Sequence, residues 1–230
     1  MLLLFDIDGT LLLRASAQHA TALHEALASV YGTRAPQQRI NAAGRTDTAI
    51  ARELAALAGV DAERFEAGLE RFKAVCVERF AKLCPASLTD RVAPGMRELL
   101  ASLEGRSDVS LSLVTGNYEP VARLKLERAG IGRHFAPGQG AFGSDAESRD
   151  ELPAIARARA GDHPREGTIV IGDTPLDIAC ARADGLAVLA VATGPYPASQ
   201  LSGADAVAAD GWELGPLLDQ PGLSARAACS

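Results

Sequence analysis

The chain has few of the residues that mark nucleic-acid-binding, membrane or secreted proteins. Only 4% of its 230 residues are aromatic, and 23 lysines and arginines against 29 aspartates and glutamates give a net charge of −6. Nucleic acid and anionic membranes are therefore not expected as partners. The first apolar run, Leu2 to Phe5, is too short to span a bilayer and lacks the basic flank of a signal peptide. We expect a soluble, cytoplasmic protein.

Cysteine is also scarce, with four residues and no CxxC pair (Cys76, Cys84, Cys180 and Cys229). A disulfide framework needs many cysteines in a short secreted chain, so we expect reduced thiols. Apolar residues, in contrast, make up 47% of the chain, which is enough for a sizeable core. The length fits a single large domain or a core that carries a smaller inserted module.

The apolar pattern places a helical stretch inside an alternation of strands and helices. A strand expected over 2–5 is followed by three stretches of helical spacing, at 16–31, 46–57 and 61–83. Beyond Pro94 the pattern predicts helices over 96–103, 121–129, 151–160 and 176–183, and strands over 109–114, 168–171 and 187–191. Strands separated by helices indicate a parallel sheet. We therefore expect an α/β, Rossmann-like core from residues 1–14 and 90–220, an all-helical insert over 15–89 and a frayed tail over 221–230.

Polar residues follow three of the predicted strands, namely Asp6 with Asp8, Thr115, and Asp173. Ligands of open α/β sheets bind at the carboxyl ends of strands, so these side chains are expected to converge on one site. Asp6 and Asp8 are two residues apart and lie on one side of an extended chain, about 6.5 Å apart. Gly9 then allows a sharp turn. Such a pair can place one carboxylate on a reacting centre and the other near its leaving group.

These segments resemble motifs of the haloacid dehalogenase (HAD) superfamily. The sequence D-I-D-G-T at 6–10 resembles its first motif, L-V-T-G-N at 113–117 its second, and V-I-G-D-T-P-L-D at 170–177 its fourth. The helical insert is similar to the cap domain of the phosphoglycolate-phosphatase-like branch. The resemblance implies a hydrolase, a Mg²⁺-dependent phosphomonoesterase that acts on a small phosphorylated metabolite through an aspartyl-phosphate intermediate.

The resemblance also implies roles for individual residues. Asp6 would be the nucleophile, and Asp8 would protonate the leaving oxygen and then activate water. Mg²⁺ would be bound by Asp6, Asp173 and the carbonyl oxygen of Asp8, with Asp177 behind them. Thr115 would act as a catalytic residue on a phosphate oxygen. The expected substrate-binding residues are Gly9, Thr10, Gly116, Asn117 and Arg45.

The third motif of the family, a lysine before the Asp173 strand, is missing. The chain has three lysines (Lys73, Lys82 and Lys125), and none lies in that segment. Arg149 occupies the expected place and would be the catalytic cation, although its planar head is not equivalent to an ammonium. Lys125, in the helix after Thr115, is a weaker substitute.

Several polar residues have a simpler interpretation as helix caps or surface residues. Thr46 is expected to cap the second helix, and Thr174 with Asp177 approximates a capping box. Asn117 is a candidate cap for the helix that follows it. Asp47, His19 and His24 are expected on solvated helix faces.

Other functions on this fold remain open. Asp8 argues against a haloacid dehalogenase, and the cap lysines Lys73 and Lys82 lie far from the glycine loop, which argues against a phosphonate hydrolase. A β-phosphoglucomutase-like phosphomutase keeps both aspartates and is an alternative, as is a non-catalytic metabolite-binding protein. The sequence specifies neither the substrate nor whether the protein is a monomer or a dimer.

Overall fold

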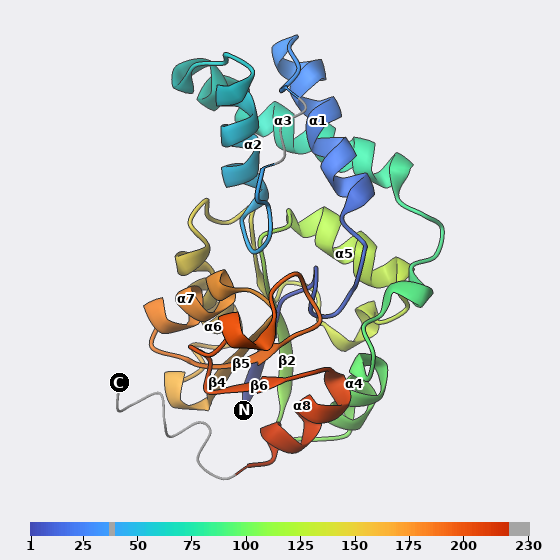
Figure 1. Cartoon of the computed structure of the whole chain (residues 1–230), viewed down its shortest axis with the longest axis vertical. Helices are drawn as coiled ribbons and strands as arrows, with labels where there is room; N and C mark the ends of the chain where they lie inside the picture. The colour runs from blue at the N-terminus through green and yellow to red at the C-terminus, as the bar shows by residue number, and fades with distance from the viewer. Residues whose placement is uncertain (37–39, 221–230) are drawn as a thin grey trace.

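The computed structural model describes residues 1–36 and 40–220 and shows a helical part above a part that contains the sheet (Figure 1). The predicted tail, 221–230, lies outside the described residues. Six strands pair in parallel in the order β3-β2-β1-β4-β5-β6. Their bounds are β1 Leu2–Phe5, β2 Ser110–Thr115, β3 Ala141–Phe142, β4 Thr168–Gly172, β5 Ala187–Val191 and β6 Ala206–Ala208. This is the strand order of doubly wound Rossmann sheets, and it confirms the predicted α/β fold class.

The central strand β1 is buried on both faces, as its continuous apolar sequence predicts. Leu3 and Phe5 pack on the side of the sheet that α4, α5 and α8 cover. Leu2 and Leu4 face the opposite side, against α6 and α7. The bounds of these helices are α4 Met96–Glu104, α5 Glu119–Arg128, α6 Leu152–Arg159, α7 Pro175–Ala183 and α8 Gly211–Leu218. Both faces of the sheet are therefore covered, which leaves its carboxyl edge as the place for a site.

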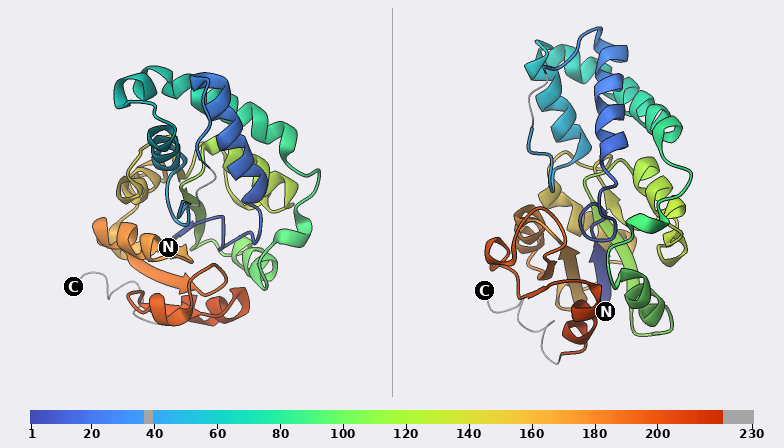
Figure 2. Two further views of the ribbon diagram at one scale, coloured as in Figure 1. Left: turned by 45° about the horizontal axis from the view of Figure 1, so that its top comes forward. Right: turned by 45° about the vertical axis from the view of Figure 1, so that its right-hand side comes forward.

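Between β1 and α4 the chain forms a second group of helices, α1 Ala17–Tyr31, α2 Asp47–Leu57 and α3 Ala62–Leu83, which we call the three-helix unit. It has a hydrophobic core of its own, to which Tyr118 and Val121 near the start of α5 contribute. Both views in Figure 2 show the unit over the carboxyl edge of the sheet. The unit therefore covers the edge where ligands of such sheets bind.

The three helices of this unit begin one residue after the predicted starts, because the first predicted residue is in each case the residue before the helix. Thr46 accepts a hydrogen bond from the Ala49 amide, which confirms the predicted cap. Asp61 caps α3 in the same way. Ser16 makes no such bond to α1, and its hydroxyl donates instead to Asp8.

Two strands and one α-helix were not predicted from the sequence, namely β3, β6 and α8. The two strands have only two and three residues, too few to show a period. Helix α8 contains Gly215 and Pro216, both of which disfavour a helix in a pattern-based prediction.

Two further expectations concerned the cysteines and membrane-spanning segments. Cys76, Cys84 and Cys180 are free thiols. Among the described residues, none of the helices combines the length and the apolar character that crossing a membrane requires.

Candidate active site

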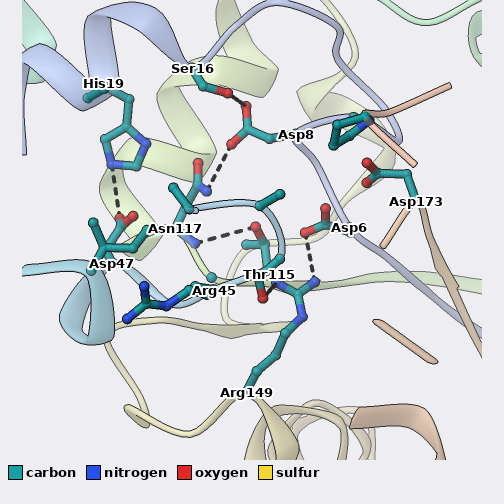
Figure 3. Close-up of a pocket in the computed structure, with 18 of the residues that line it drawn as sticks. Asp6, Asp8, Ser16, His19, Arg45, Asp47, Thr115, Asn117, Arg149 and Asp173 are labelled. Carbon is teal, nitrogen blue, oxygen red and sulfur yellow. Dashed lines mark hydrogen bonds and ion pairs between the residues drawn. The ribbon is translucent and has the colours of Figure 1, made fainter. Parts of the chain in front are cut away.

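A cavity of about 290 Å³ lies between the carboxyl edge of the sheet and the three-helix unit (Figure 3). Most residues that the sequence nominated line it, namely Asp6, Asp8, Gly9, Arg45, Thr115, Gly116, Asn117, Arg149 and Asp173. The two others are behind its wall, where Thr10 bonds to Asp173 and Asp177 pairs with Arg149. The sequence motifs therefore meet at one place in the fold.

The turn after β1 brings the first and fourth motifs together. The Asp6 amide still pairs with the Ile171 carbonyl of β4, at 2.9 Å, and thus extends the sheet by one residue. Gly9 follows with a φ of +97°, where a Cβ would lie 2.1 Å from Asp173 Oδ2. Thr10 donates to Asp173 Oδ1 at 3.0 Å. A side chain at residue 9 would therefore strain the turn and displace Asp173.

Asp6 and Asp173 form a pair of buried carboxylates that lacks enough positive charge. Among the described residues, Asp173 Oδ2 is buried and has no hydrogen-bond partner. Burial, followed by the charge of Asp6, raises the pKa of Asp173 to about 9. Burial also raises the pKa of Asp6 to about 6, against the opposing effect of Arg149. An unpartnered oxygen beside a second carboxylate is the donor set that hard divalent cations prefer, so the residues present fit such a cation.

Arg149 supplies the one strong cationic contact to Asp6 among the described residues. It lies in the short helix Arg149–Glu151, has 7% of its surface exposed, and its Nη2 is 3.0 Å from Asp6 Oδ1. The same nitrogen pairs with Asp177 Oδ1, and Nη1 donates to the carbonyl of Gly44 at 3.0 Å. The arginine thus holds the end of β1, the start of α7 and the loop before α2 together.

Asp177 belongs to the same acidic group but is fully engaged by the protein. Its Oδ2 accepts the amide and the hydroxyl of Thr174, and the Asp177 amide donates back to the Thr174 hydroxyl, which confirms the predicted capping box. Its Oδ1 pairs with Arg149. Although Asp6, Asp173 and Asp177 each have an oxygen within 4.8 Å of the others, only the first two have an oxygen free for a cation.

The raised pKa values predict how stability depends on pH when metal is absent. Unfolded aspartate titrates near 3.8, so above that pH the folded state binds more protons than the unfolded state. The free energy of unfolding must then fall as pH rises through about 6 and about 9. Asp173→Asn removes a carboxyl group that must take up a proton on folding at this pH, and we expect it to raise the melting temperature in chelator by several degrees near pH 8.

Thermal unfolding in chelator from pH 5 to pH 9 measures this effect. Asp90→Asn, the same change on an exposed side chain, is the control and should follow the wild type. The interpretation is wrong if Asp173→Asn shows the same slope with pH as the wild type.

Asp8 has a different environment from Asp6. Its Oδ2 accepts from Lys125 Nζ at 2.6 Å and from Asn117 Nδ2 at 2.9 Å, and its Oδ1 accepts from Ser16 at 3.2 Å. Burial alone would raise the pKa of Asp8, but the ammonium of Lys125, together with His19 and Asn117, outweighs this and holds that pKa below its ordinary value. The pKa values of the two aspartates of the first motif are therefore shifted in opposite directions, because each has a different cation and only Asp6 shares its surroundings with Asp173.

The structure corrects three predictions about polar residues near Asp8. Asn117 does not cap α5, since Tyr118 occupies the cap position and the Asn117 side chain bonds to Asp8. His19 and Asp47 are not solvated, with 5% and 2% of their surfaces exposed. They pair with each other at 3.0 Å (Figure 3), and Asp47 also accepts the Tyr118 amide. His24 is exposed, as expected.

Arg45 lines the cavity, but its guanidinium is engaged within the three-helix unit. It pairs with Glu53 and donates to the carbonyl of Ala49. Its backbone passes directly over the second motif, where a Cβ on Gly116 would lie 2.0 Å from the Arg45 carbonyl oxygen. Glycine at residue 116 therefore allows the loop before α2 to approach the sheet edge.

Comparison with known proteins gives one family for most of the chain. The model of haloacid dehalogenase-like hydrolases matches residues 3–182, and a second HAD hydrolase-like model matches residues 151–214.

Two curated relatives match most of the chain at 29% identity over 208 residues. One is named probable phosphatase IndB, from Dickeya dadantii, and the match covers 89% of this chain and 86% of the relative. The other is a phosphoglycolate phosphatase from Mesorhizobium japonicum, with 84% and 83% covered. Among solved structures, β-phosphoglucomutase from Clostridium difficile superposes with a TM-score of 0.74 over 98% of both chains, at 14% identity. At that identity the last likeness concerns the fold alone.

Proposed function

The chain belongs to the haloacid dehalogenase-like hydrolases, and on that premise we propose that it is a Mg²⁺-dependent phosphatase acting on a small phosphomonoester. One observation carries this proposal more than any other, the meeting of Asp6 and the unpartnered Asp173 oxygen at the carboxyl edge of the sheet. Phosphoryl transfer requires little besides an in-line nucleophile and neutralisation of the equatorial oxygens. We assign the first of these to Asp6, and the ligands for the second to Asp6 and Asp173.

In the proposed reaction, a carboxylate oxygen of Asp6 attacks phosphorus while the ester oxygen leaves, which forms an aspartyl phosphate. Asp8 gives a proton to the leaving oxygen and then takes one from the water that hydrolyses the acyl phosphate. Lys125 keeps Asp8 charged in the free enzyme, which suits the second step. The approach of the anionic phosphate favours the protonated form that the first step requires.

A bound Mg²⁺ would neutralise the phosphate oxygens and so allow a carboxylate to approach them. Asp6, Asp173 and the carbonyl oxygen of Asp8 would hold it. Arg149 would keep Asp6 in place and add a second positive charge beside it, in the role that the lysine of the family's third motif is expected to fill. Thr115, buried at the end of β2, offers a hydroxyl to the phosphate.

We also propose that the three-helix unit, within residues 15–89, is the cap that closes the cavity. On its side the cavity is lined by the apolar residues Ala20, Leu23, Ala42, Ala43 and Ile50, together with Ser16, His19, Gly44, Arg45 and Asp47. Arg45 is paired with Glu53 and His19 with Asp47. We therefore expect the organic part of the substrate to be small and to contact the cap mainly through neutral groups.

Release of inorganic phosphate from a panel of phosphomonoesters tests the function. We expect turnover with Mg²⁺ that falls at least a hundredfold in chelator and returns when Mg²⁺ is restored, because no protein cation contacts the free Asp173 oxygen among the described residues. The panel includes sugar phosphates, 2-phosphoglycolate and nucleoside monophosphates.

The same assay separates the alternatives. Conversion of one sugar phosphate into its isomer, without release of phosphate, would replace the phosphatase with a phosphomutase. Binding without turnover of any compound, by protein shown to be folded, would indicate a non-catalytic metabolite-binding protein.

A further inference from the structure

Lys125 is a fully buried cation whose three N–H bonds all have acceptors. It lies on α5 with 0% of its surface exposed. Its Nζ is 2.6 Å from Asp8 Oδ2, 2.7 Å from Asn117 Oδ1 and 3.3 Å from His19 Nδ1. The ammonium also lies 5.8 Å from the centre of the Phe80 ring. An ammonium has three donors, so this geometry fixes its position completely.

The acceptor at His19 connects Lys125 to the three-helix unit. Because Lys125 donates to Nδ1, the proton of a neutral His19 ring lies on Nε2. That nitrogen lies 3.0 Å from Asp47 Oδ2, in close contact but without the angle of a hydrogen bond. Asp47 is fixed in turn by the Tyr118 amide at 2.7 Å. A continuous row of contacts thus runs from Asp8 through Lys125 and His19 to Asp47, and joins the turn after β1 to α1 and α2.

The two buried cations of the site serve different carboxylates. Arg149 contacts Asp6 and Asp177, whereas Lys125 contacts Asp8. The sequence suggested Lys125 as a weaker substitute for the missing lysine. In the structure, its two shortest contacts are to Asp8 and to Asn117, and the Asn117 side chain also bonds to Asp8. Lys125 therefore acts on a different carboxylate from Arg149.

We propose that Lys125 is a positioning residue that fixes the orientation of the Asp8 carboxyl group for proton transfer to the leaving oxygen. Lys125 and Asn117 both hold Oδ2, whereas Oδ1 accepts only the longer Ser16 bond, at 3.2 Å, among the described residues. Asp8 and Ser16 both line the cavity. Proton transfer needs the carboxyl within hydrogen-bond reach of the ester oxygen, and a displacement of about 1 Å is enough to cost a large part of the rate. The inference rests on the proposed phosphatase function.

The test uses the dependence on the leaving group. As the P–O bond of an alkyl phosphate breaks, its oxygen must receive the proton from Asp8, whereas the p-nitrophenolate ion leaves without one. We expect Lys125→Met to lower kcat/KM for an alkyl phosphate by about a hundredfold, and for p-nitrophenyl phosphate by no more than about threefold. The ratio of the two values does not depend on how much of the variant is folded.

Lys73→Met is the matched control, since Lys73 lies on α3 and pairs with the exposed Glu70. It should leave both kcat/KM values unchanged. In an Asp8→Asn background, Lys125→Met should cause no further selective loss, because the group that it positions is already gone.

Equal losses on both esters, or losses that multiply in the double variant, would overturn the positioning role. The proposed function is checked separately by the wild type in the same plate. If the wild type releases phosphate from neither ester, the phosphatase function fails and this inference fails with it.

Discussion

Asp6→Asn is expected to reduce phosphate release by a factor on the order of 10⁴ or more, the largest effect of any single change in the cavity. Asparagine has nearly the same shape and keeps the contact with Arg149 possible, but its amide oxygen is a poor nucleophile toward phosphorus. Loss of the nucleophile removes the covalent path, and what remains is binding and electrostatic stabilisation. Steady-state phosphate release with Mg²⁺ measures the effect.

Binding of inorganic phosphate by calorimetry serves as the control for this variant, because the anion site is otherwise intact. Asp90→Asn repeats the chemical change on the surface and should retain full activity. More than about a tenth of the wild-type rate in Asp6→Asn would exclude Asp6 as the nucleophile.

Arg149→Met has the second largest expected effect, a loss of about 10² to 10³ in turnover together with a lower melting temperature. The change leaves Asp6 and Asp177 buried without the cation between them, and breaking a buried pair in this way costs about 3–5 kcal/mol. Arg149→Lys should recover part of the activity. A single ammonium restores the charge, but the fork that reaches Asp6, Asp177 and the Gly44 carbonyl together is lost.

Arg159→Met is the matched control, because Arg159 forms a partly exposed pair with Asp145 in the turn after β3. Surface pairs of this kind contribute about 0–1 kcal/mol, so activity and melting temperature should barely change. Turnover is compared per folded molecule, with the folded fraction taken from circular dichroism. Wild-type turnover in folded Arg149→Met would show that Arg149 has no part in the reaction.

The predictable part of the molecule is the part where a local pattern determines the structure. The buried run of β1 places Asp6 and Asp8 at the carboxyl end of the central strand, and β2 and β4 place Thr115 and Asp173 on either side of them. Parallel pairing then brings these ends together without any further information. For the same reason the α/β fold class followed from the order of strands and helices.

The sequence did not show the burial and contacts of residues such as Lys125 and His19, because these depend on which face of a helix packs against another element. Lys125 lies at helical spacing from Val121 and Ala122, and all three are buried on one face of α5. His19 similarly shares a buried face of α1 with Leu23 and Ala26. In both helices a polar residue on an apolar face was the available signal, since such a residue requires a buried partner.

No local pattern predicts the partners of those residues. Asp47 is the first residue of α2 and has only a capping context in the sequence. It pairs with His19, 28 positions earlier, because the N-terminal ends of α1 and α2 both lie at the same edge of the sheet. The contact between Lys125 and Asp8 spans 117 positions. Such contacts follow from the tertiary packing of the three-helix unit on the core.

Detection of the phosphoryl enzyme tests the central claim most directly. The protein is mixed with a ³²P-labelled phosphomonoester and Mg²⁺, quenched in acid within milliseconds and digested, and the labelled peptide is identified by mass spectrometry. The account predicts acid-stable, base-labile label on Asp6, absent in Asp6→Asn and present in Lys125→Met. Label on another residue, or release of phosphate at full rate by an enzyme that never carries label, would contradict it.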